Sequence, residues 1–69
     1  MADMISVNSS LIKAVGYDDL AGELIILFKC RESYAYKVSS AAFDALLDAG
    51  SPGRYFIDNI RGQVPHRKL

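Results

Sequence analysis

The chain has little of what nucleophilic catalysis or disulfide bonding requires. It contains one cysteine, Cys30, one histidine, His66, and no tryptophan among its 69 residues. A single cysteine cannot form an intramolecular disulfide bond. Because Cys30 and His66 are far apart in the sequence and no motif supplies a third group, we predict no catalytic residue and a protein that is not an enzyme.

Long apolar runs and the pattern of a signal peptide at residues 1–5 are also missing. Residues 1–5 lack the basic region and the apolar stretch of a signal peptide. No apolar run approaches the roughly 18 residues that a membrane helix needs. We therefore expect a cytoplasmic protein of bacterial type that makes no contact with membranes.

No pattern for a metal ion or a phosphate group is present. Asp18, Asp19 and Glu23 lie close together in the sequence, but their spacing matches no cation-binding loop, and turn formation explains them. No glycine-rich phosphate loop occurs. We therefore predict neither a metal nor a cofactor.

The chain also lacks an excess of charge of one sign. It holds 8 Lys and Arg residues against 8 Asp and Glu residues. This balance disfavours a generic polyanion binder, which usually has a basic excess. The charges are unevenly placed, with one base against four acids in residues 1–28 and four bases against one acid in residues 50–69. An electrostatic dipole across the fold is one interpretation, and solvated charges without a partner are the other.

What is present is the composition of one small folded domain. Hydrophobic residues make up 51% of the chain, which is typical of a folded protein. A chain of this length buries only about 60% of the surface that its unfolded form exposes, so its core is small. We expect a single domain over residues 1–69 with loose ends at 1–9 and 63–69, and a partner or a second copy would add stability.

Residues 24–38 are the part around which the rest of the chain is organised, since strand-favouring residues are densest there. The segments that we predict to be strands are residues 11–17, 23–30 and 34–38. Residues 23–30 are apolar on both faces, which predicts a central strand whose second face is covered. The simplest arrangement is a three-stranded antiparallel meander, and Met4, Ile5 and Val7 are candidates for a short extra edge strand.

After the third predicted strand, the hydrophobic period changes to that of a helix. Residues 39–50 and residues 51–62 each begin with a serine that can cap a helix and approach a glycine that can end it. Pro52 suits the first position of the second helix. The sequence therefore predicts an α+β domain, a small three-stranded antiparallel β-meander followed by two short α-helices packed on one sheet face.

Four groups of residues in this pattern resemble the KTSC domain, which is named for its place at the C-terminus of some lysyl-tRNA synthetases and also occurs as a small stand-alone bacterial protein. These groups are Ser9-Ser10, Val15-Gly16-Tyr17-Asp18, Tyr34-Ala35-Tyr36, and Ser51-Pro52-Gly53-Arg54-Tyr55-Phe56 with Ile60-Arg61. The resemblance runs from about Asn8 to Pro65. The chain departs from it at Arg31, where the family has glycine in a hairpin turn, and at Ser39, where the family usually has proline.

The resemblance implies the fold described above and a family for which RNA binding has been suggested from the synthetase context. Tyr34 and Tyr36 share one strand face and are candidates for stacking on bases. The alternative is that both rings pack beneath the helices. Lys37, Arg54 and Arg61 are candidates for phosphate contacts, with a structural role or simple exposure as the alternatives.

A second candidate surface lies on the other sheet face. If the helices cover the face of Leu24, Ile26 and Phe28, then an apolar strip remains opposite, formed by Ile25, Leu27 and Ala35. Such a strip indicates a homodimer or another protein contact, unless another part of the chain folds over it. Two hypotheses follow, a non-catalytic RNA-binding accessory module and a protein-interaction or self-association module.

Overall fold

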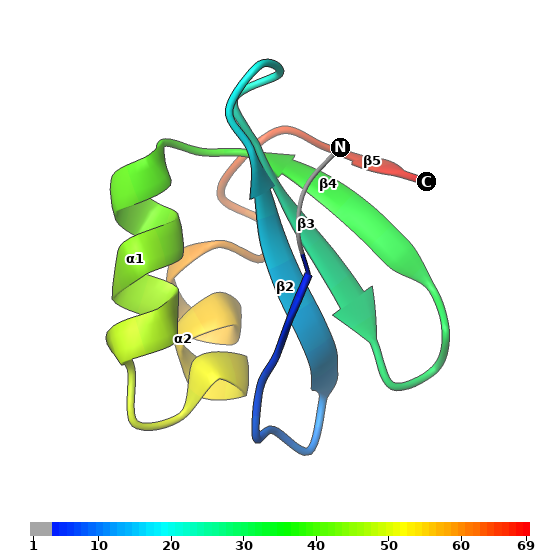
Figure 1. The fold of residues 1–69 in the computed structure, drawn as a ribbon, viewed down its shortest axis with the longest axis vertical. Helices are drawn as coiled ribbons and strands as arrows, with labels where there is room; N and C mark the ends of the chain where they lie inside the picture. The colour runs from blue at the N-terminus through cyan, green and yellow to red at the C-terminus, as the bar shows by residue number, and fades with distance from the viewer. Residues whose placement is uncertain (1–3) are drawn as a thin grey trace.

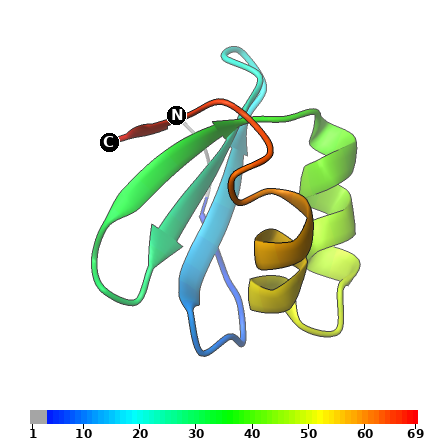
Figure 2. The ribbon, with the colours of Figure 1, turned by 180° about the vertical axis from the view of Figure 1, so that it is seen from behind.

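A computed structural model describes residues 4–69 as an antiparallel sheet with two helices on one face (Figure 1). The five strands are β1 (Ile5–Ser6), β2 (Ile12–Asp18), β3 (Glu23–Phe28), β4 (Ser33–Lys37) and β5 (His66–Lys68), and they lie in that order across the sheet. The helices α1 (Ser40–Asp48) and α2 (Pro52–Asn59) form the connection from β4 to β5. Figure 2 shows from behind that both helices lie on the same side of the sheet.

The α+β class, the helices and the three central strands are confirmed, but the prediction of only three strands is wrong. We expected loose ends at residues 1–9 and 63–69, whereas β1 pairs with β2 and β5 pairs with β4. The residues of β5 are all charged or polar, so they carry no alternating pattern from which a strand is predicted. Backbone pairing holds them instead, and the loose start expected for residues 1–3 lies outside the described residues.

A β-bulge in β2 decides which of its side chains enter the core. Ile12 pairs with Phe28 while Ala14 pairs with Leu27, so the register shifts at Lys13. A strict period of two would place Ile12 and Val15 on opposite faces. The bulge adds one residue to β2 and brings both onto the helix side, where neither has any exposed surface.

The core lies between the sheet and the helices, on the face predicted for it. Leu24, Ile26 and Phe28 of β3 are all buried there. The other buried members of this cluster, from β2, β4 and the helical region, are Ile12, Val15, Tyr36, Leu46, Phe56 and Ile60. Since α1 packs against β2 and α2 rather than against β4 and β5, the helices leave the β4–β5 side of this face less covered.

The turn between β3 and β4 contains a left-handed residue that is not glycine, Arg31, with φ of 72°. The Arg31 N–H donates to the Phe28 carbonyl at 3.0 Å, and the Phe28 N–H donates to the Glu32 carbonyl at 2.9 Å. A turn followed by one left-handed residue gives this pattern, and glycine fits that place best. The departure at Arg31 therefore keeps the turn geometry, at a cost of about 1–2 kcal/mol.

Gly53, in the first turn of α2, allows that helix to approach the segment before β2. A Cβ atom added at Gly53 would lie 2.7 Å from the Ser9 hydroxyl oxygen. That oxygen is already fixed, because it accepts hydrogen bonds from the N–H groups of Leu11 and Ile12 at 3.1 and 3.2 Å. The group Ser9-Ser10 and the group that begins Ser51-Pro52-Gly53 therefore contact each other through Ser9 and Gly53.

We expect Gly53→Ala to lower the free energy of unfolding by about 1 kcal/mol or more, because the clash outweighs the gain in helix propensity. Gly50→Ala is the matched control, since a Cβ there meets nothing within 4 Å. Chemical denaturation measures both. In a Ser9→Ala background the Gly53→Ala loss should shrink, and an unchanged loss would contradict the contact.

An ion pair links β5 to β3 across the strand β4, which lies between them. The Arg67 guanidinium donates to both carboxylate oxygens of Glu23, at 3.2 and 3.0 Å. This hydrogen bond lowers the pKa of Glu23 below its usual value of 4.5. Desolvation is the next largest effect and opposes the lowering, and the charges of Arg67 and Lys37 add to it. Lys68 makes a further ion pair with Glu32 at 3.3 Å.

The stabilisation from Glu23 should therefore be present above pH 4.5 and disappear as the pH falls through its lowered pKa. We expect Glu23→Gln to be less stable than the wild type at neutral pH and equally stable in strong acid. Thermal unfolding across this pH range measures the difference, with Asp44→Asn on the exposed side of α1 as the control. A stability gap that stays constant down to strong acid would refute the linkage.

Candidate functional site

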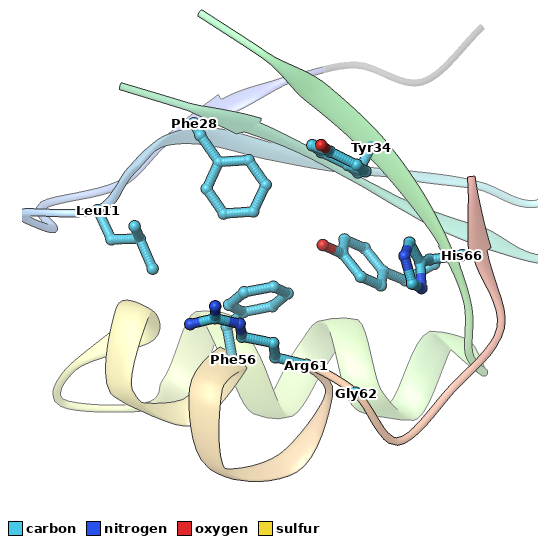
Figure 3. A pocket seen from close by; sticks show the side chains of 8 residues that line it. Leu11, Phe28, Tyr34, Phe56, Arg61, Gly62 and His66 are labelled. Carbon is cyan, nitrogen blue, oxygen red and sulfur yellow. The ribbon is translucent and has the colours of Figure 1, made fainter. Parts of the chain in front are cut away.

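A pocket of about 450 Å³ opens between α2 and the β4–β5 side of the sheet (Figure 3). Its lining comes from segments that are far apart in the sequence: Leu11, Phe28, Tyr34, Tyr36, Phe56, Arg61, Gly62 and His66. The volume lies in the range of small-molecule sites, about 300–1,000 Å³. The pocket exists because the helices cover only part of this sheet face.

Five aromatic rings line the pocket and contact one another. Phe56 lies edge-on to both Phe28 and Tyr36, with ring centroids 5.4 and 5.1 Å apart. His66 stacks on Tyr36 with centroids 5.5 Å apart, because the β4–β5 register pairs these two residues. Tyr34 completes the set, 6.3 Å from Tyr36. These rings give the pocket flat, apolar walls of the kind on which a planar ligand stacks.

Two polar groups in the pocket have no side-chain partner among residues 4–69. Tyr36 is 6% exposed, yet its hydroxyl makes no hydrogen bond with any described residue. Arg61 is exposed, likewise makes no ion pair or hydrogen bond through its side chain with residues 4–69, and points toward the pocket (Figure 3). The Tyr34 hydroxyl differs, since it donates to the Glu32 carboxylate at 3.3 Å.

The charge state of Tyr36 follows from its surroundings. Burial raises the pKa of the Tyr36 phenol above its usual value of 10.0, the nearby Tyr34 adds to the rise, and the positive charge of Arg61 opposes it. Tyr36 is therefore a neutral phenol at physiological pH, able both to donate and to accept a hydrogen bond. With the five N–H donors of Arg61, the pocket offers mainly donors to a ligand.

The structure brings together three of the five candidate nucleic-acid residues. Tyr34, Tyr36 and Arg61 line the pocket. Lys37 lies elsewhere, on the outer sheet face, where its ammonium group donates to the Ala21 carbonyl at 3.0 Å. Arg54 pairs with Asp58 at 3.0 Å on the exposed side of α2.

Five lining residues were not among the sequence-derived candidates, namely Leu11, Phe28, Phe56, Gly62 and His66. Leu11, Phe28 and Phe56 are apolar, and an apolar side chain gives no signal that separates a pocket wall from a closed core. His66 falls in the tail that we expected to be loose, and only the β4–β5 pairing places it beside Tyr36. That pairing is not encoded in any pattern that we recognised in the sequence.

The outer sheet face is less apolar than we expected. Ile25 and Leu27 are partly buried, and Ala35 has no exposed surface. Ala35 lies opposite Arg67 on this face, and the pair of Arg67 with Glu23 crosses β4 beside it. Of the three predicted interface residues, only Ile25 and Leu27 therefore present surface to a partner.

Features of other kinds of site are few in residues 4–69. These residues contain no group of three His, Cys, Asp or Glu side chains that could hold a metal ion. Neither of the two helices is long and apolar enough to cross a membrane. Cys30 is an exposed free thiol in the turn before β4.

Comparison with known proteins supports the resemblance seen in the sequence. The family model for the KTSC domain matches residues 8–63. The crystal structure of a KTSC domain protein from Yersinia pestis superposes with a TM-score of 0.93 and is 33% identical, and the match covers 100% of this chain and 99% of that chain. None of the curated proteins matches. The prediction of this family is confirmed.

The geometry of the pocket predicts how Tyr36 titrates. We expect the pKa of Tyr36 to lie above 10.0 and to rise further in Arg61→Gln, because the substitution removes the charge that favours the phenolate. NMR of the tyrosine rings against pH measures it. Arg54→Gln removes an equal charge away from the pocket and should leave the Tyr36 pKa unchanged. If both variants shifted Tyr36 equally, Arg61 would not face it.

Proposed function

Because the chain belongs to the KTSC domain family, we propose that it is a non-catalytic accessory module that binds single-stranded RNA and holds one unpaired base in the pocket. The observation that carries the proposal is the Tyr36 hydroxyl, which has no hydrogen-bond partner among residues 4–69 and belongs to a residue that lines the same aromatic pocket as Arg61, whose side chain also has no partner in that range. The suggestion of RNA as the partner comes from the family, and the pocket provides the aromatic walls and polar groups that could hold a base.

An unpaired RNA base suits these walls. A base offers flat faces for stacking and an edge with hydrogen-bonding atoms, and single-strand binders use aromatic side chains in this way. Tyr34, Phe56 and His66 provide rings, while Arg61 and Tyr36 provide polar groups. A base inside a duplex could not enter, because its faces and its pairing edge are occupied.

The charge balance of the chain fits a local site rather than a broad basic surface. Arg54, Arg67 and Lys68 are each paired with a carboxylate. Arg61 has no such partner among the described residues and lies at the pocket. We therefore propose few phosphate contacts and a correspondingly shallow dependence of binding on salt.

Self-association through the outer face is the alternative function. It would use Ile25 and Leu27, the two residues of that strip that have exposed surface. Two partly buried side chains provide less area than a stable interface usually requires. We therefore place RNA binding first.

The test is a titration of the labelled protein with tRNA and with short single-stranded RNA at about 50 mM salt, where phosphate contacts are strongest. We expect NMR shift changes at Tyr34, Tyr36 and Arg61. Arg61→Gln should weaken binding by about tenfold or more, since a hydrogen bond to a charged group contributes about 1.5–3 kcal/mol.

Arg54→Gln is the matched control. It removes the same charge from the same region of the chain, but from a side chain that pairs with Asp58. We expect this variant to bind within about twofold of the wild type, since salt screens charges that are not in contact with the ligand. Equal losses in the two variants, or an absence of shift changes in the pocket, would contradict the proposal.

A further inference from the structure

We propose that the pocket selects an unpaired guanine, with Arg61 bound to the O6 and N7 atoms of the base and Tyr36 making a further hydrogen bond. This inference rests on the proposed RNA-binding function and names the base that the site accepts. It depends on the hydrogen-bonding partners that the side chains of Arg61 and Tyr36 require in a ligand, and on the aromatic rings that surround these side chains.

Arg61 determines which edge of the base the pocket recognises. A guanidinium group has only donors, in a fixed planar fork, so its best ligand presents two adjacent acceptors. The guanine edge formed by O6 and N7 meets this requirement, and contact with arginine is its commonest specific recognition. Adenine places an amino donor beside N7 and would oppose the guanidinium. Uracil separates its two carbonyl oxygens by an N–H donor.

Tyr36 supplies a second hydrogen-bonding group. Among residues 4–69, no fully buried side-chain N or O atom lacks a hydrogen-bond partner, so the unpaired Tyr36 hydroxyl is not sealed off. The residue as a whole is 6% exposed, and the pocket is the space that it lines. A ligand in the pocket can therefore contact Tyr36. As a neutral phenol, it pairs with either a donor or an acceptor on the base.

The rings favour a purine over a pyrimidine. Cytosine also has two adjacent acceptors, but its single ring covers less of a wall built from five aromatic groups. A purine with two fused rings gains more contact area from the same walls. Tyr34 and His66 lie at the more exposed side of the cluster, where a base entering from a single strand first meets an aromatic ring.

The experiment compares five-nucleotide RNAs that differ only at the central base. Fluorescence anisotropy measures binding to UUGUU, UUAUU, UUCUU and UUUUU at one salt concentration. We expect UUGUU to bind about tenfold or more tightly than the other three, because a bidentate pair discriminates by about that factor. Replacing the central guanine with 7-deazaguanine removes N7 and should abolish most of this preference.

Two variants assign the preference to the pocket. Arg61→Lys keeps the charge but not the fork, so it should lower the guanine preference to about twofold while binding to UUUUU stays nearly unchanged. Tyr36→Phe keeps the ring and should weaken UUGUU severalfold more than UUUUU. Since Arg61 is exposed, Arg61→Lys should keep the fold, and the NMR spectrum of each variant checks this.

The outcomes separate this inference from the function on which it rests. Equal binding of the four RNAs would overturn guanine selection and leave RNA binding intact. A guanine preference that survives both Arg61→Lys and 7-deazaguanine would also overturn it, by placing recognition elsewhere. Absence of binding to all four RNAs and to tRNA would overturn both proposals.

Discussion

The pairing of β5 with β4 is the constraint on which the rest of the candidate site depends. It sets His66 against Tyr36 and brings Arg67 within reach of Glu23. Without this pairing, β4 would be an edge strand whose helix-side rings faced open solvent on one flank. The three polar residues of β5 thus complete one wall of the pocket, beyond the edge of the hydrophobic core. Backbone hydrogen bonds and ion pairs, rather than apolar burial, hold these residues in place.

The two faces of the sheet are stabilised by different physical effects. The helix side buries large aliphatic and aromatic side chains, among which Leu24, Ile26 and Leu46 are fully enclosed. The outer side relies on small or partly covered residues and on the pair between Arg67 and Glu23. A chain of this size has too little apolar material to cover both faces of five strands. The same shortage leaves the pocket between α2 and β4 unfilled.

Much of the fold could be predicted from the sequence, because β3 is a dense run of strand-favouring apolar residues, β4 alternates between its two faces, and both helices have a helical hydrophobic period. The bulge at Lys13 and the strand β5 could not, since the first breaks the period and the second has none. The site was predicted in part. Period two placed Tyr34 and Tyr36 on one face and Lys37 on the other, which already separated Lys37 from the two rings. A spacing of seven residues would place Arg54 and Arg61 on one side of a continuous helix, but α2 ends at Asn59, before Arg61.

The left-handed residue Arg31 has a consequence for the site that lies beyond its own turn. The side-chain direction in a strand alternates with every residue, so a slip of one position in the β3–β4 hairpin would exchange the two faces of β4. Ala35 would then line the pocket, and the tyrosines would lie on the outer face. A turn that admits one left-handed residue at one place resists such a slip. The turn geometry at Arg31 thus helps to fix the register that keeps the aromatic rings of β4 on the pocket side of the sheet.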